Sequence, residues 1–267
     1  MSQRELSRAD AVHLRSGDDH YVAYVGPPEQ YDAMALTQLA LLGAMGLRSN
    51  HNLLDLGCGS LRAGRLLIPY LDPGRYYGIE PNDWLVEDGI KHELGHSILD
   101  IKQPHFAYRR DFDASLFGVR FDFVLAQSVL SHTGRALAVE ALTKMRRVLA
   151  PNGIALVSLA ERHWPRGKDC REGWVYPDVV VFDRGEVRSM ARESGLSVAR
   201  LHWHHPRLRW YVFVHGGCAL PSWTAIHQSG RMAAFRPSWQ GKSRRGLIER
   251  LPPEMLARLR ALKARSN

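Results

Sequence analysis

The sequence is poor in cysteine: Cys58, Cys170 and Cys218 are the only three in 267 residues. Three scattered thiols are too few for a disulfide framework or a thiolate zinc site, which is typical of a reducing compartment. The chain also lacks any run of about 18 apolar residues, and its first ten residues are polar and charged. We therefore expect neither a membrane span nor a secretory signal, and predict a cytoplasmic protein.

The sequence also lacks a complete dinucleotide fingerprint, although Leu53–Gly64 (LLDLGCGSLRAG) contains part of one. A short apolar run precedes Gly57 and Gly59, and a helical pattern follows at once, so the stretch predicts a strand, a tight turn and a helix. The fingerprint needs a third glycine where Arg62 stands. A pyrophosphate is therefore disfavoured. Asp55, just before the turn, favours a cationic or hydroxyl-rich ligand instead.

Acidic residues also follow the next predicted strands. The strand Tyr76–Ile79 ends at Glu80, about twenty residues after Gly59, where doubly wound folds place an acid on a ribose diol. Two further strands are predicted at 105–109 and 121–126, and they lead into Asp111-Phe112 and Gln127-Ser128. One acid at a strand end would be a weak signal. Acids at three successive strand ends predict a nucleoside ligand at this edge of the sheet.

This series resembles the class I S-adenosylmethionine-dependent methyltransferases over residues 29–215. The strings GCGSLRAG and YYGIEPN resemble a bacterial branch that acts on small molecules of largely unassigned identity. The resemblance implies S-adenosylmethionine as the cofactor, with Glu80 on its ribose and Asp111-Phe112 on its adenine. The cofactor contacts that it implies come from Tyr31, Asp55, Gly57, Cys58, Gly59, Arg62, Glu80, Pro81, Asn82, Asp111, Phe112, Gln127 and Ser128. A tyrosine on a buried helix face is more often plain core, so Tyr31 has a second interpretation.

The order of the predicted elements favours an α/β fold, because strand–helix units in series give a parallel sheet with right-handed crossovers. The resemblance implies a doubly wound, mostly parallel sheet of seven strands in the order 3-2-1-4-5-7-6, the last antiparallel, with helices on both faces. We expect an N-terminal extension at 1–28, the methyltransferase domain at 29–216 with a substrate lid at 161–181, and a basic C-terminal extension at 217–267.

Three local predictions concern the connections. Residues 1–19 show no clear periodicity, so we expect them to be loosely held. Residues 20–25 are typical of a short extended piece before Gly26-Pro27-Pro28. The run Ala150-Pro151-Asn152-Gly153 predicts a turn between a helix at 135–149 and a fifth strand at 154–159.

The net charge of +9 is concentrated near the end of the chain. From Arg231 onward there are ten Lys or Arg against two Glu, which leaves the rest nearly neutral and argues against a body shaped for nucleic acid. Pro252-Pro253 begin a predicted amphipathic basic helix. Such a helix packs on the body or on a second copy in a homodimer, or contacts an anionic membrane surface or a nucleic acid.

A histidine is the best candidate for a catalytic base. His132 follows the fourth strand, opens onto the ligand edge, and has an ordinary pKa near 6.5. Its alternative role is to hold the turn by hydrogen bonds to the backbone. Weaker candidates are His163, His204 and His205, whose alternative is solvated surface. No carboxylate lies near His202, His204 and His205 in the sequence, so we expect no metal.

Methyl transfer from a sulfonium needs mainly a well-placed acceptor and no fixed set of catalytic residues. The sequence therefore indicates the cofactor site but not the substrate. We predict transfer to a hydroxyl of a small-molecule or sugar-containing metabolite, stacked on Trp164, Trp174 and Tyr176. Transfer to a nitrogen or a carboxylate is the alternative, and a nucleic-acid- or membrane-binding module is the alternative from another class. No Asn/Asp-Pro-Pro-Tyr/Phe motif follows the fourth strand, which argues against methylation of adenine or glutamine amides.

Overall fold

The computed structural model describes residues 2–161 and 172–220. These residues belong to one compact unit. The predictions for His163, Trp164 and the basic helix after Pro252 lie outside the described residues. So do the predicted contacts of that helix with a second copy or a membrane surface.

The sheet has the predicted strand order. Its strands are β1 (Leu53–Leu56), β2 (Tyr76–Ile79), β3 (His105–Ala107), β4 (Phe121–Ala126), β5 (Leu149–Glu161), β6 (Val181–Phe182), β7 (Leu196–Arg200) and β8 (Arg209–His215). Their order is β3-β2-β1-β4-β5-β8-β7, and the short β6 pairs with the end of β5 outside this path. β8 runs antiparallel to both neighbours, as expected for the last strand. The two-residue β6 was not predicted.

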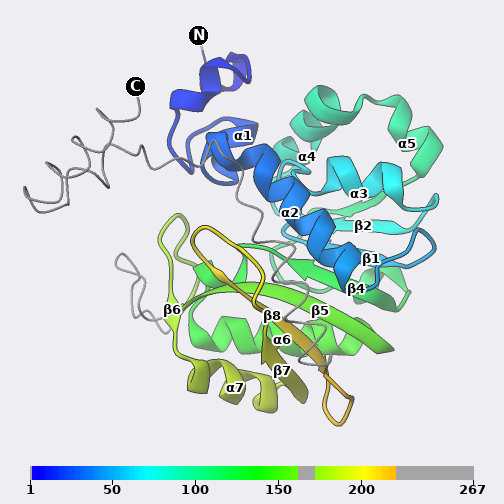
Figure 1. Cartoon of the computed structure of the whole chain (residues 1–267). Helices are drawn as coiled ribbons and strands as arrows, with labels where there is room; N and C mark the ends of the chain where they lie inside the picture. The colour runs from blue at the N-terminus through cyan, green and yellow to red at the C-terminus, as the bar shows by residue number, and fades with distance from the viewer. Residues whose placement is uncertain (1, 162–171, 221–267) are drawn as a thin grey trace, which may run out of the picture. The chain divides into compact units, whose positions relative to one another are not determined.

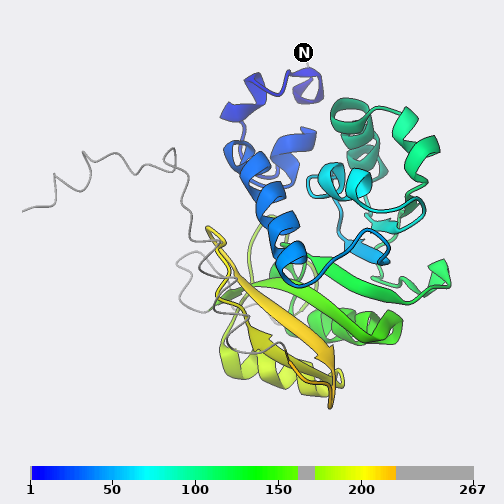
Figure 2. The ribbon, with the colours of Figure 1, turned by 45° about the vertical axis from the view of Figure 1, so that its right-hand side comes forward.

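Helices cover both faces of this sheet (Figures 1 and 2). The α-helices are α1 (Tyr21–Tyr24), α2 (Tyr31–Ala44), α3 (Gly64–Tyr70), α4 (Asp83–Gly89), α5 (Ser97–Lys102), α6 (Arg135–Val148) and α7 (Arg184–Glu193), and a π-helical segment, Ile90–Leu94, extends α4. One apolar cluster joins α2, α3 and α4 to the sheet, and a second joins α6 and α7. Because the central strands are buried on both faces, they read as continuous apolar runs rather than alternating ones.

The N-terminal segment differs from its prediction. Residues 20–25 are not extended: His20 accepts a hydrogen bond from the N–H of Val22 at 3.2 Å and starts helix α1. Nor is the preceding segment loosely held, because Arg8 forms ion pairs with Asp32 and Glu93. Side-chain capping and a distant ion pair fix this segment, and neither leaves a periodic signal in the sequence.

The predicted turn at 150–153 is also wrong, because these residues lie within β5. The pairing of β4 with β5 moves from Phe121 opposite Leu149 to Phe123 opposite Ile154, so the extra residues form an irregularity in the strand. The Pro-Asn-Gly composition that predicts a turn therefore marks a bulge. Among the described residues, none of the helices has the length and apolarity that crossing a bilayer requires.

Candidate active site

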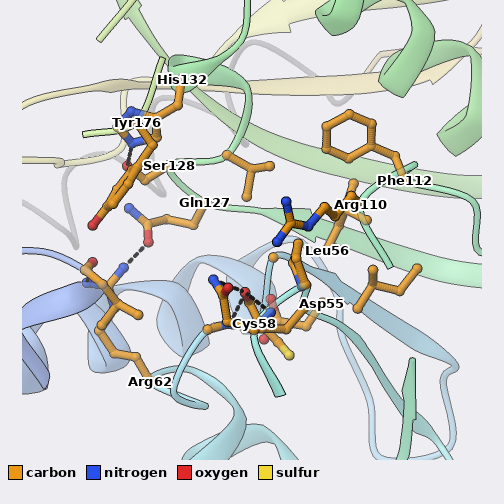
Figure 3. Close-up of a pocket in the computed structure, with 18 of the residues that line it drawn as sticks. Asp55, Leu56, Cys58, Arg62, Arg110, Phe112, Gln127, Ser128, His132 and Tyr176 are labelled. Carbon is orange, nitrogen blue, oxygen red and sulfur yellow. Dashed lines mark hydrogen bonds between the residues drawn. The ribbon is translucent and has the colours of Figure 1, made fainter. Parts of the chain in front are cut away.

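A cavity of about 370 Å³ lies where β1, β2 and β4 end. Most of the predicted site residues meet there (Figure 3). Those that line the cavity are Asp55, Gly57, Cys58, Gly59, Arg62, Glu80, Pro81, Asn82, Phe112, Gln127, Ser128, His132, Trp174 and Tyr176. The carboxyl edge of a parallel sheet is the usual place for a ligand in this kind of fold.

The glycine turn brings backbone to the cavity. Gly57 and Gly59 have φ of +71° and +54°, a region that side chains disfavour. A Cβ on Gly57 would lie 2.4 Å from Val129, and one on Gly59 2.6 Å from Val25. The sequence predicts a helix directly after the turn, but α3 starts only at Gly64. The turn is therefore longer than the sequence pattern indicates, and Arg62 belongs to it.

Two buried carboxyl groups line the cavity at neighbouring strand ends. Asp55 accepts a hydrogen bond from the Tyr76 hydroxyl at 2.8 Å, and burial raises the pKa of Asp55 to about 6. Glu80 accepts from the N–H of Gly59 and the N–H of Asn82, each at 3.0 Å, and burial raises its pKa too. Within the described part of the chain neither makes an ion pair. Buried acids without a cation suit a ligand that brings positive charge and hydroxyl groups.

The predicted adenine pair is divided. Phe112 lines the cavity with φ +56°, but Asp111 is not among the lining residues. The Asp111 carboxylate instead accepts from Arg109 Nε at 3.0 Å, and this guanidinium holds the Asp111 pKa well below its usual range. The sequence reasoning missed Arg110, which lines the cavity beside Phe112 (Figure 3). Its position directly before Asp111-Phe112 could have indicated that it lies at the site.

Tyr31 also lies away from the cavity. It is buried on α2, and its hydroxyl donates to the backbone oxygen of Ser60 at 3.0 Å. The core interpretation of Tyr31 therefore describes its position. Its hydroxyl supports the glycine turn from behind, since Ser60 is part of that turn.

His132 is buried in the wall of the cavity and has a defined orientation. Its Nδ1 lies 2.6 Å from the backbone oxygen of Asp178, and its Nε2 lies 3.3 Å from the Ser128 hydroxyl (Figure 3). Because a carbonyl only accepts, Nδ1 carries the proton and Nε2 is the acceptor. Burial lowers the pKa of His132, so the ring is neutral at neutral pH. Both roles that the sequence allowed, base and turn support, are compatible with this geometry.

The other described histidines do not line the cavity. His204 is exposed. His205 is buried rather than solvated, with its Nε2 3.2 Å from the side-chain nitrogen of Gln127. His205 thus lies behind a cavity residue and contacts the site only through it. In the described residues there is no group of three metal-ligating side chains.

Aromatic side chains close the His132 end of the cavity. The rings of Trp174 and Tyr176 are stacked with centroids 6.4 Å apart, and Tyr176 lies edge-on to His132 at 4.9 Å. The Tyr176 hydroxyl donates to the backbone oxygen of Tyr24. Tyr24 and Val25 also line the cavity, although the sequence placed them in an extension outside the domain. Only tertiary contacts bring these two residues to the site.

A doubly wound sheet with an antiparallel β8, and a cavity over an Asp-x-Gly-x-Gly turn, define the class I methyltransferase fold. Residues 54–155 match a family model described as a methyltransferase domain. No curated protein sequence matches the chain. Residues 54–155 thus form a methyltransferase domain, and the predicted S-adenosylmethionine-dependent methyltransferase activity and cofactor are confirmed.

Solved structures of low sequence identity share the fold. Magnesium protoporphyrin IX methyltransferase (ChlM) from Synechocystis PCC 6803, solved with bound SAM, has a TM-score of 0.55 and 15% identity, covering 80% of this chain and 98% of its own. DesVI from Streptomyces venezuelae has a TM-score of 0.55 and 18% identity, with coverage of 79% and 99%. The CcbJ methyltransferase from Streptomyces caelestis has a TM-score of 0.56 and 16% identity, with coverage of 81% and 99%.

Proposed function

We propose that this enzyme methylates a hydroxyl group of a small-molecule or sugar-containing metabolite, and that His132 accepts the hydroxyl proton. One observation carries the proposal: the Asp178 carbonyl holds the proton on Nδ1 and leaves the Nε2 lone pair for a hydroxyl at the cavity wall. Ser128 already occupies that position at 3.3 Å. A substrate hydroxyl replaces it with the same geometry.

The chemistry requires little else from the protein. Bound S-adenosylmethionine supplies a methyl group that is already activated. The acceptor oxygen forms a bond to that methyl carbon while the carbon–sulfur bond breaks, so the products are a methyl ether and S-adenosylhomocysteine. The hydroxyl proton passes to His132 Nε2. A base placed in this way contributes roughly 10²–10⁴-fold to rate.

For the cofactor, we assign the acids of the cavity to separate groups. Glu80 accepts from the ribose hydroxyls, because the Gly59 and Asn82 amides already fix its orientation. Asp55 faces the cationic part, since it is buried and makes no ion pair among the described residues. Phe112 covers the adenine ring, and Gln127 and Ser128 lie beside the methionine part at the end of β4. Asp111 has no part in this assignment because it pairs with Arg109.

Product chemistry tests the proposal directly. The protein is incubated with S-adenosylmethionine carrying an isotopically labelled methyl group and with pooled small molecules that contain hydroxyl, amino or carboxyl groups. We expect the label in a product that resists mild base, as an ether does and an ester does not. His132→Gln should lower kcat about 10²-fold for that product, with His96→Gln as an exposed control. A labelled ester or methylamine as the sole product would contradict hydroxyl methylation.

A further inference from the structure

We infer that the methyl acceptor is an acid, whose carboxylate or similar oxyanion is bound by Arg62 and Arg207 at the His132 end of the cavity. This inference rests on the proposed function in one respect: it places the acceptor beside His132. It adds the substrate class, a hydroxy acid, and assigns a role to Arg207, which follows β7 and does not itself line the cavity.

Among the described residues Arg62 is a buried cation that makes no ion pair, although the charge of Asp55 acts on it. Its Nη1 donates to the backbone oxygen of Val25 at 2.9 Å, and its Nη2 donates to the side-chain oxygen of Gln127. Its Nε has no hydrogen-bond partner, and none of the described carboxylates pairs with it. A fully buried guanidinium usually pairs with a carboxylate or phosphate, because the desolvation of an unpaired charge costs several kcal/mol.

Arg207 places a second cation beside the first. A Cβ on Gly26 would lie 3.3 Å from a terminal nitrogen of Arg62 and 3.3 Å from a terminal nitrogen of Arg207. These two nitrogens are therefore no farther apart than twice that distance. Arg207 Nε is also buried without a partner. Burial, with Arg207 adding to it, lowers the pKa of Arg62 to about 10, so both side chains stay charged at neutral pH.

A polar cluster on the cavity wall, made of Gln38, Arg62, Gln127 and the adjoining His205, leaves donors without acceptors. Gln127 Oε1 accepts from Arg62 and from Gln38, while Gln127 Nε2 faces His205 Nε2 at 3.2 Å. His205 Nδ1 accepts from two backbone N–H groups at 2.9 and 3.1 Å, so its Nε2 carries the proton. Two donors then face each other. Rotating the Gln127 amide satisfies His205 but turns an NH₂ group toward Arg62. In either orientation two donors face each other, and the Nε atoms of Arg62 and Arg207 keep no partner, although Gln38 Oε1 is a buried acceptor without one. An oxyanion would accept from these donors.

The cofactor alone does not balance this charge. S-adenosylmethionine brings a sulfonium and an ammonium against one carboxylate, so its own net charge is positive. The charge of Arg207 acts on His132 and on Tyr176, which places it on the acceptor side. The described acid whose charge acts on Arg207 is Glu29, which is exposed and forms no ion pair with it. Arg62 and Arg207 (+2), the cofactor (+1), and Asp55 with Glu80 (−2) together sum to +1, a charge that an acidic acceptor neutralises.

The test uses a minimal acid that cannot be methylated on a hydroxyl. The full chain, saturated with S-adenosylhomocysteine, is titrated at neutral pH with benzoate and with the neutral benzamide. We expect benzoate to bind at least tenfold more tightly. Arg207→Gln should abolish this preference, Arg207→Lys should keep part of it, and Arg209→Gln, two residues along on β8, should leave it intact. Thermal melting of each variant shows that it is folded.

Three results would overturn the inference. The first is wild-type protein that binds neither probe below about 10 mM, or binds both equally. The second is an unchanged preference in Arg207→Gln. In the third, Arg207→Gln binds S-adenosylmethionine more weakly but binds its decarboxylated analogue as before, and the preference for benzoate is unchanged. That result would assign the two arginines to the carboxylate of the cofactor. Because the probes contain no hydroxyl, these results are independent of whether His132 is a base.

Discussion

At the scale of single residues, Asp55 links cofactor binding to pH. Its pKa is raised to about 6 in the ligand-free protein, so the carboxyl gains its charge as the pH rises through that value. A cationic ligand binds the charged form more tightly. We therefore predict that the affinity for S-adenosylmethionine falls about tenfold from pH 7 to pH 5 in the wild type, measured by calorimetry.

Asp55→Asn should remove much of this pH dependence and weaken binding at pH 7. The same substitution should stabilise the ligand-free protein. A carboxyl whose pKa is higher in the folded than in the unfolded protein destabilises the fold as the pH rises above the unfolded-state pKa, and asparagine removes this effect. The expected gain in free energy of unfolding at pH 7 is about 1–3 kcal/mol. Equal affinities for the two proteins at both pH values would show that Asp55 does not contact the cationic part of the cofactor.

His132 predicts a different pH profile, which concerns rate. Burial lowers its pKa, so Nε2 is free to accept a proton at neutral pH and becomes protonated only in more acidic solution. With S-adenosylmethionine saturating at every pH, so that Asp55 does not contribute, we expect kcat/KM for the acceptor to be level near neutral pH. It should fall as the pH drops below the lowered pKa of His132. His132→Asn should lower the rate about 10²-fold and remove this acidic limb. An unchanged limb in the variant would assign the titration to another group.

At the scale of elements, the packing of α4 against the glycine turn holds the site together. A Cβ on Gly89, at the end of α4, would lie 2.4 Å from the backbone oxygen of Ser60. We predict that Gly89→Ala lowers the free energy of unfolding by about 2 kcal/mol or more, because backbone must move, and that it weakens cofactor binding.

Gly43 offers a matched control on another helix. It lies in α2, and a Cβ there would meet no atom within 4 Å. Gly43→Ala should raise the free energy of unfolding by about 0.5–1 kcal/mol, since alanine favours the helix. Urea unfolding of both variants gives the comparison. Similar effects of the two substitutions would show that the contact of Gly89 with Ser60 is not important.

Some of these elements could be predicted from the sequence and others could not. The glycine turn, the central strands and the strand order follow from apolar runs, spacing and the family resemblance. Helix α1 and the irregularity in β5 do not, because a histidine cap and a shifted strand pairing are decided by contacts that composition does not reveal. Local signals compete with tertiary contacts, and at these two places the tertiary contacts prevail.

The site shows the same division. Asp55, Glu80 and Gln127 could be found because each lies at or just after the end of a predicted strand. Asp111 has the right position in the chain, but its carboxylate pairs with Arg109 and is not among the groups that line the cavity. Arg207 joins the cluster from a loop far along the chain, and only the folded structure brings it to Arg62.

At the scale of the whole molecule, the cavity is built from a limited part of the chain. Among the described residues, those that line it lie between Tyr24 and Tyr176. We predict that a chain ending at Leu220 binds S-adenosylmethionine with an affinity within about threefold of the full chain, measured by calorimetry with thermal melting as the test of folding. A folded but non-binding truncation would show that the residues after 220 contribute to the site.

The most direct test of the account is a calorimetric titration of S-adenosylmethionine into the wild-type protein and into Glu80→Gln, which keeps the shape of the side chain but loses its charge. We predict saturable binding with one site per chain in the wild type. Binding should be at least tenfold weaker in the variant, because the two ribose hydroxyls lose a charged acceptor. Equal affinities in the two proteins would contradict the assignment of the cavity. Wild-type protein that ignores S-adenosylmethionine but binds a nicotinamide or flavin cofactor would contradict the account as a whole.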